Sequence, residues 1–312
     1  MIIMNKYDFS EKNGTGMPEK AEWDALPAPD CDLHVHMVLD GADWKAAMAE
    51  HSPVPDEALI RERLDAYRGA GVTFLRDGGD SHGACLKAKE LAPEYGITYL
   101  APAFPIYKKG HYGGFIGRGW TDYDGYMELV NEAADSGADF IKLMISGLMD
   151  FDRAGKVTEA PLSSEEITDI ADMAHDEGFA VMAHCNGSDA ALAAAEAGIE
   201  TIEHGAFLSR RAIDAMADAR TIWIPTLSPI ANLVGCGRFP DGSVLYDLRT
   251  AQENIRYAVS KGVRVGLGSD AGAYMVPHVT GARTEYALLR MTLGQDTDEI
   301  IGDAERLVRK MF

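Results

Sequence analysis

The stretch GADFIKLMISG, residues 137–147, is an apolar run that contains a single lysine, Lys142. Its large apolar residues predict a short strand that is buried on both faces, as in a parallel sheet. An ammonium group in such a strand costs several kcal/mol unless it is paired or chemically changed. The stretch therefore predicts a strand of an α/β fold, and it singles out Lys142 for a chemical explanation.

The same unit recurs along the chain: a glycine, a short β-rich run, a loop and a helix. Besides residues 137–143 it occurs as GVTFLRD (71–77), GITYLAP (96–102), GFAVMAH (178–184), GIETIEH (198–204) and GVRVGLGSD (262–270). ARTIWIPT (219–226) fits without the glycine, and CDLHVH (31–36) opens the series. The glycines stand where a helix should end, since the left-handed conformation there favours glycine.

Helical patterns separate these runs, and the alternation predicts the fold. The patterns include DEALIRERLDAYR (56–68), SSEEITDIADMAHDE (163–177) and SDAALAAAEA (188–197). The spacing of Ser163 and Glu166 predicts a capping box. Eight strands alternating with helices indicate parallel βαβ units, which most simply close into a (β/α)8 TIM barrel. A doubly wound open sheet is the alternative, although no glycine-rich nucleotide loop follows the first run.

The sequence shows no boundary between two domains. We expect residues 1–30 to form an irregular lead-in and residues 31–312 to form one barrel domain. The final stretch, residues 297–312, predicts a helix that packs back on the barrel.

The composition is that of a soluble globular protein and argues against some partners. Of the 312 residues, 46% are apolar and 25% charged, and the formal net charge is −20. Nucleic acids and anionic membranes are themselves negative, so neither is an expected partner. The four cysteines form no CxxC pair, and no apolar run approaches the ~20 residues of a membrane span. We therefore expect a cytoplasmic protein, as a monomer or a homo-oligomer.

Four of the nine histidines end a predicted strand, at the rim where chemistry collects in a barrel. The side chains expected to meet there are His34, His36, Lys142, His184, His204 and Asp270. Taken singly, each has a structural explanation, such as a hydrogen-bonded core histidine or an aspartate that caps a turn. Imidazoles, a carboxylate and a modifiable lysine on one rim predict a site for divalent metals, most simply zinc.

In these runs the sequence resembles the amidohydrolase superfamily, specifically its binuclear metal-dependent branch with prolidase-like and imidazolonepropionase-related members. The matching stretches are DLHVH, GVTFLRDGG, GADFIKLMISG, MAHCNG, IEHGAF and VGLGSDAG, in family order between residues 30 and 275. The resemblance implies a (β/α)8 barrel. Many relatives also carry a small β-sandwich subdomain built from both chain ends, which we expect to be absent here.

The resemblance also implies which residues bind the two metal ions. His34, His36 and Asp270 would hold one ion, and His184 and His204 the other. Lys142 would be carboxylated by CO2 and bridge both. Its apolar surroundings lower the pKa of the amine, so part of it is neutral and able to attack CO2. A lysine that stays an ammonium, beside a single metal, is the alternative.

The activity implied by the resemblance is hydrolysis of an amide bond in a small substrate, such as a dipeptide, an N-acyl amino acid or a cyclic amide. A metal-bridging hydroxide would attack the carbonyl, and Asp270 would pass its proton to the leaving nitrogen. A deaminase or lactonase of the same superfamily is an alternative, although no glutamate closely follows His184 as in the deaminases. A Schiff-base, aldolase-like lyase using Lys142 and a metal-binding barrel without turnover are the others.

The run FPIYKKGHYGGFIGRGW, residues 104–120, is the most unusual connection, being long, glycine-rich, aromatic and locally basic. Such loops at a rim often bind substrate or form a lid. His111, Tyr112 and Arg118 are candidates to bind a substrate carboxylate, the alternative being a surface loop with solvated charges. Elsewhere, LRDGG predicts a structural pair between Arg76 and Asp77.

Overall fold

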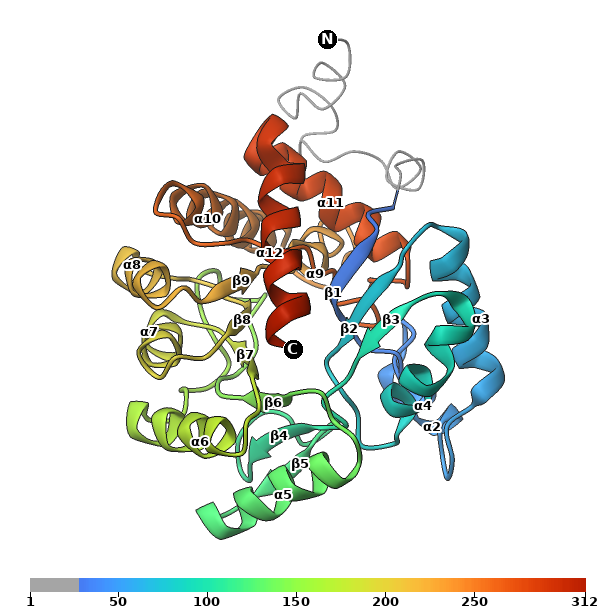
Figure 1. Ribbon diagram of the computed structural model, residues 1–312. Helices are drawn as coiled ribbons and strands as arrows, with labels where there is room; N and C mark the ends of the chain where they lie inside the picture. The colour runs from blue at the N-terminus through green and yellow to red at the C-terminus, as the bar shows by residue number, and fades with distance from the viewer. Residues whose placement is uncertain (1–27) are drawn as a thin grey trace.

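The computed structural model describes residues 28–312, whose strands form two parallel sheets. The first has the order β1-β2-β3, with β1 at Cys31–Val35, β2 at Phe74–Asp77 and β3 at Thr98–Leu100. The second has the order β5-β4-β6-β7-β8-β9. Its strands are β4 Pro105–Lys108, β5 Arg118–Trp120, β6 Ile141–Met144, β7 Val181–Cys185, β8 Thr201–His204 and β9 Ile222–Ile224. Figure 1 shows the strands around a common centre with most helices outside them. The predicted α/β class with parallel strands is confirmed.

The run at 262–270, predicted as the last strand, is not a regular strand, yet it connects the two sheets. Trp223 of β9 donates to the carbonyl of Arg264 at 2.9 Å and accepts from Gly266 at 2.9 Å. On the other side, the amide of Leu33 in β1 donates to the carbonyl of Leu267 at 2.9 Å. A Cβ on Gly266 would lie 2.5 Å from Cδ1 of Ile224, so a larger residue here would displace that packed side chain.

The connection at 104–120 is more ordered than the sequence predicts, because it contains β4 and β5. Strand β3 pairs with β2, whereas β4 pairs with β6 and β5. Between β3 and β4 the backbone bends at Ala103, whose φ is 65°. The amide of Asp139 donates to the carbonyl of Ala101 at 2.9 Å, which ties the end of β3 to the approach to β6.

The helices follow the predicted alternation. They are α2 Trp44–Glu50, α3 Glu57–Gly69, α4 Ala84–Leu91, α5 Tyr123–Asp135, α6 Ser164–Asp176, α7 Ser188–Glu196, α8 Arg210–Ala219, α9 Leu227–Ala231, α10 Asp241–Ser260 and α11 Thr280–Leu293, with 3₁₀ turns at Ala92–Tyr95 and Gly294–Asp296. The predicted capping box between Ser163 and Glu166 is confirmed at the start of α6. The six glycines that precede the predicted runs all have positive φ, as expected at helix ends.

The last helix, α12 at Thr297–Met311, lies across the amino ends of the strands (Figure 1). Its Ala304 and Val308 are buried in one cluster with Cys31 and Phe74, which begin β1 and β2. Beyond the helix, the ring of Phe312 lies 5.0 Å from that of Phe140. The predicted terminal helix is confirmed. It packs at the amino ends of the strands and not at their carboxyl ends.

Between residues 28 and 312, no helix is both long and apolar enough to cross a bilayer. The predicted lead-in at residues 1–30 lies almost wholly outside the described residues.

Candidate metal centre

His34 of β1, His36 directly after the strand and one aspartate form a tight group at the carboxyl end of β1. Nε2 of His34 lies 3.6 Å and Nε2 of His36 lies 3.5 Å from Oδ1 of Asp270. One ligand atom from each residue lies within 4.8 Å of those of the other two. Ligand atoms that bind zinc tetrahedrally at about 2 Å are about 3.3 Å apart. The spacing of this group therefore suits one small divalent cation.

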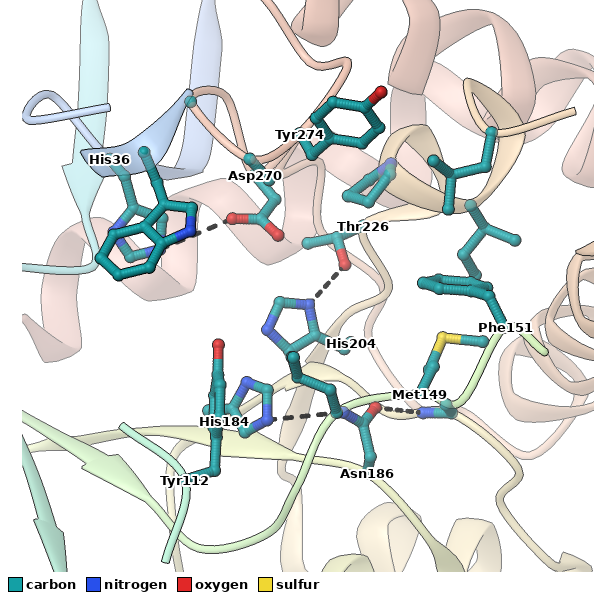
Figure 2. Close-up of a pocket in the computed structure, with 18 of the residues that line it drawn as sticks. His36, Tyr112, Met149, Phe151, His184, Asn186, His204, Thr226, Asp270 and Tyr274 are labelled. Atoms are coloured by element: carbon teal, nitrogen blue, oxygen red, sulfur yellow. Dashed lines mark hydrogen bonds and ion pairs between the residues drawn. The ribbon is translucent and has the colours of Figure 1, made fainter. Parts of the chain in front are cut away.

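His184 at the end of β7 and His204 at the end of β8 lie beside this group (Figure 2). Their ring centroids are 4.7 Å apart, and the ring of His204 is 5.1 Å from that of His34. Nδ1 of His204 hydrogen-bonds the hydroxyl of Thr226 at 2.7 Å, and Nε2 of His184 hydrogen-bonds the carbonyl of Gly147 at 3.1 Å. Each ring thus has one nitrogen engaged with the protein and a second available to a ligand.

Lys142 extends from β6 into the same cavity and is 1% exposed. Its Nζ has no hydrogen-bond partner among the described residues. Burial lowers the pKa of this amine to about 8, so a share of it is uncharged near neutral pH. A buried cation without a partner is costly, so the structure, like the sequence, indicates that Lys142 is either neutral or chemically modified.

Burial also favours the uncharged form of the surrounding side chains. It lowers the pKa of His36 and of His184 to about 3, and it holds the pKa values of His34 and His204 well below the ordinary value. A neutral imidazole is the form that binds metal. Burial raises the pKa of Asp270 to about 7.

The backbone is strained at three points around the cavity. His204, Asp270 and Thr226 have φ values of 66°, 58° and 45°. This left-handed conformation is unfavourable for residues with a Cβ, and it persists where the surrounding structure holds it. His204 is held by Trp223, whose Nε1 donates to its carbonyl at 2.9 Å. Such strain is common at functional sites.

Glu203 is a site residue that the sequence analysis missed. Its carboxylate is fully buried and lies 2.6 Å from Nδ1 of His34 and 2.7 Å from the guanidinium of Arg76. The sequence feature that could have identified Glu203 is an acidic residue within the short predicted strand TIEH (201–204), directly before His204. The bond at Nδ1 leaves Nε2 of His34 facing Asp270, without a hydrogen bond of its own in the part of the chain described here.

The predicted pair between Arg76 and Asp77 is wrong. The two are neighbours on β2, so their side chains point to opposite faces of the strand. Arg76 donates to Glu203 and to the carbonyl of Leu33. Asp77 accepts from the amide of Met37 at 2.8 Å and from the hydroxyl of Tyr99 at 2.5 Å.

Of the three substrate-binding candidates, only Tyr112 lines the cavity. Its ring is 4.8 Å from that of His184. Arg118 instead pairs with Glu132 of α5 and stacks on Phe104 at 4.4 Å. His111 lies 3.7 Å from Glu159 and outside the lining. We therefore keep Tyr112 as a candidate and carry neither His111 nor Arg118 into the proposal.

The cavity above these residues has a volume of about 820 Å³. All six predicted rim residues line it, namely His34, His36, Lys142, His184, His204 and Asp270. The remaining wall is largely apolar. Uncharged imidazole nitrogens and a carboxylate lie here, together with two buried atoms, Nε2 of His34 and Nζ of Lys142, that have no hydrogen-bond partner within residues 28–312; this donor set fits divalent metal ions.

The fold and the residues at the carboxyl ends of the strands indicate a class of protein, and comparison with known sequences identifies the family. The model of the amidohydrolase family matches residues 31–311, so the chain belongs to that family. Two uncharacterized proteins, from Mycobacterium tuberculosis and Mycobacterium bovis, are each 34% identical to it over 152 residues. The match covers 46% of this chain, and the chain spans 40% of the length of these relatives.

Solved structures share the fold at lower identity. A Xaa-Pro dipeptidase with bound methionine has a TM-score of 0.70 and 21% identity, covering 91% of this chain and 76% of that one. The A. niger ochratoxinase has a TM-score of 0.69 and 21% identity, covering 88% and 69%. A prolidase in complex with N-methylphosphonate-L-proline has a TM-score of 0.66 and 22% identity, covering 89% and 74%.

Proposed function

We propose that this protein is a metal-dependent hydrolase that cleaves an amide bond in a small substrate. The observation that carries the proposal is the convergence of His34, His36 and Asp270, whose ligand atoms lie within 4.8 Å of one another, in a cavity that also holds Lys142. Membership of the amidohydrolase family supports it. We further propose that the two sheets and the 262–270 run together form a (β/α)8 TIM barrel, since that run hydrogen-bonds to both β9 and β1.

The proposed ligand assignment follows the grouping of the side chains. His34, His36 and Asp270 would hold one ion, while His184 and His204, with ring centroids 4.7 Å apart, would hold a second. Zinc is the expected metal, because imidazole and carboxylate ligands suit it.

Lys142 would bridge the two ions as a carbamate. The ammonium group would first lose one proton; the neutral amine would then attack the carbon of CO2 and lose a second proton, so that a buried cation is replaced by an anion that the two cations stabilise. The burial that lowers the pKa of Lys142 to about 8 supports this, because only the neutral amine can attack.

The side chains of the cavity would divide the remaining tasks. When bound, the divalent ions lower the pKa of a coordinated water and polarise a carbonyl group. Asp270 would take up a proton at its carboxylate and deliver it to the nitrogen of the leaving amine. Thr226 and Glu203 would fix the ring orientations of His204 and His34 through the bonds at 2.7 and 2.6 Å. The apolar wall would exclude competing water.

The test is to assay the metal-loaded protein against dipeptides, N-acyl amino acids, cyclic amides and lactones. We expect amide hydrolysis, about two zinc ions per chain, loss of activity with a chelator and recovery with zinc. A carbamate carbon signal after incubation with ¹³C-bicarbonate would report carboxylated Lys142. Activity that persists in metal-free protein would contradict the proposal, and preferential lactone cleavage would redirect it to a lactonase. The predicted cytoplasmic location and the homo-oligomer remain predictions.

A further inference from the structure

The cavity contains a chain of aromatic rings that begins at the candidate metal centre. The ring of Tyr112 lies 4.8 Å from that of His184, and Phe115 lies 5.7 Å beyond Tyr112. Trp44 continues the chain at 5.4 Å from Phe115 and is 45% exposed, although it lines the cavity. An exposed indole at a cavity mouth costs free energy in water, so this wall favours an apolar ligand.

A second apolar region is formed by the loops that follow β6 and β9. Met149 and Phe151 come from the first loop, and Leu233 and Phe239 come from the segment between α9 and α10, which follows β9 in the chain; the rings of Phe151 and Phe239 are 5.4 Å apart. In the view of Figure 2, Met149 and Phe151 lie on the opposite side of His204 from His36. Apolar surface is therefore available on both sides of the histidines of the candidate metal centre.

One arginine stands at the mouth of this second region. Arg238 lines the cavity, is exposed, and stacks on Tyr274 with its guanidinium 4.7 Å from the ring centroid. Among residues 28–312, no carboxylate forms an ion pair with it. Of the acidic residues in the lining, Asp43 caps α2 and Asp150 pairs with Arg153. Asp152 also lines the cavity, and its negative charge would repel a substrate carboxylate. The test therefore includes the opposite result, a preference for the neutral carboxamide.

We propose that the substrate is an N-acylated amino acid with a large apolar side chain, that this side chain occupies the region of Met149 and Phe151, and that Arg238 binds its free carboxylate. The inference rests on the proposed amide hydrolysis and specifies its substrate. The cavity volume of about 820 Å³ is near the upper end of the range for small-molecule sites, which is more than a minimal dipeptide fills. An arginine that stacks on a tyrosine is oriented for bidentate binding of a carboxylate.

The first experiment measures acetate release from three probes: N-acetyl-L-phenylalanine, its neutral carboxamide and N-acetylglycine. We expect kcat/KM for the phenylalanine acid to exceed that for the glycine acid about 10- to 100-fold, the effect of burying a benzyl group. It should exceed that for the carboxamide about tenfold. Equal values for the three probes, or a preference for the carboxamide, would overturn the inference.

The second experiment assigns the carboxylate to Arg238. Arg238→Gln should raise KM for the phenylalanine acid about tenfold and leave the carboxamide unchanged, while Arg238→Lys retains part of the preference. Arg68→Gln, an exposed arginine of α3, is the matched control and should change neither value. An equal loss on acid and carboxamide would show a structural role and overturn the assignment.

The third experiment tests the apolar region with two methionines. Met149→Ala should lower the preference for phenylalanine over glycine about tenfold with little change on N-acetylglycine, whereas Met311→Ala, on α12, should leave the preference intact. Calorimetric titration of the zinc-loaded protein with 3-phenylpropionate and 3-phenylpropan-1-ol adds a readout without turnover. The acid should bind about tenfold tighter, and Arg238→Gln should remove the difference. Identical binding to both probes would contradict the inference.

The two levels of proposal fail separately. If the zinc-loaded protein releases acetate from none of the three probes but cleaves dipeptides or cyclic amides, the hydrolase stands and the inference fails; if it cleaves no amide of the whole panel, the proposed amide hydrolysis fails and the inference fails with it. If it hydrolyses all three without regard to side chain or charge, the hydrolase stands and only the substrate class is wrong.

Discussion

Oε2 of Glu203 lies 2.6 Å from Nδ1 of His34, with both side chains fully buried. The carboxylate fixes the imidazole so that Nε2 is the nitrogen that faces Asp270. Partners of this kind orient a ligand and raise its basicity. The arrangement makes the metal affinity of the rim dependent on a residue that does not line the cavity.

Replacing Glu203 by glutamine should therefore weaken metal binding. We expect the zinc affinity to fall about 10- to 100-fold, because the amide cannot both hold His34 and neutralise Arg76. The free energy of unfolding should also fall by about 3–5 kcal/mol, since Arg76 loses its buried ion partner. Competition with a zinc indicator and chemical denaturation measure the two effects. The matched control is Glu200→Gln, which removes the half-buried partner of His175; zinc affinity that is unchanged in Glu203→Gln would contradict the proposed role.

Replacing Lys142 by methionine should reduce the metal content without unfolding the protein. The change keeps the length of the side chain and removes a buried amine, so we expect the thermal midpoint to be equal or higher. Zinc should fall from about two ions to about one per chain, and amide hydrolysis should be lost. Lys89→Met, at a half-buried ion pair with Asp139, is the control. Full metal content and activity in Lys142→Met would refute the bridging carbamate.

Replacing Asp270 by asparagine should affect turnover more than metal binding. The histidines remain, so part of the zinc should be retained, whereas proton transfer to the leaving nitrogen is lost. We expect kcat to fall at least about 10²–10⁴-fold, the range typical of general acid–base catalysis. Elemental analysis and steady-state kinetics on the same preparation provide the comparison. A parallel and equal loss of metal and kcat would show that Asp270 acts only as a ligand.

Adding a methyl group at Gly78 should disturb His36 selectively. A Cβ there would lie 2.3 Å from Cε1 of His36, so the imidazole must shift from its position beside Asp270. Gly78→Ala should therefore lower zinc affinity, by about 10-fold or more if one ligand is displaced. Gly69→Ala is the control, because nothing lies within 4 Å of its added Cβ. Unchanged zinc binding in Gly78→Ala would show that the ring has room to adjust.

The buried carboxyl of Glu285 should make stability depend on pH. It accepts hydrogen bonds from the amides of Leu227 and Ser228, yet burial raises its pKa from the ordinary 4.5 to about 8. The folded state thus binds the proton more tightly, so the stability it contributes is present below pH 4.5 and is lost as the pH rises toward 8.

Glu285→Gln removes this titration. From pH 5 to pH 8 its unfolding free energy should improve relative to the unsubstituted protein, by at most about 1.4 kcal/mol per pH unit. Urea denaturation at several pH values measures the slope. A constant difference between the two proteins across this range would contradict the raised pKa.

The sequence predicted those parts of the molecule that depend on local patterns. Histidines and an aspartate at strand ends could be expected on one rim, because parallel strands bring their carboxyl ends together, as for His34, His184 and Asp270. The helix ends followed from glycines and from the capping box of Ser163. These predictions depend on residues that are close in the chain or on the alternation of side chains along a strand.

The parts that were missed depend on contacts between distant segments. Arg76 was expected to pair with its neighbour Asp77, but alternation along β2 directs it to Glu203, 127 residues away. Arg118 was expected at the substrate, but the strand β5 directs it to Glu132. The order of β4 and β5 within residues 104–120 was also missed, because β4 pairs with β6, which lies later in the chain. No local pattern specifies such partners.

The position of Phe312 at the amino ends of the strands has a practical consequence. The guanidinium of Arg76 lies 4.8 Å from the Phe312 ring and reaches His34 through Glu203, so three contacts connect the two ends of the strand assembly. Residues joined to Phe312 would lie beside the first of these contacts. Zinc affinity should therefore be compared between variants that carry the same residues after Phe312, although this position lies at the opposite end of the strands from the candidate metal centre.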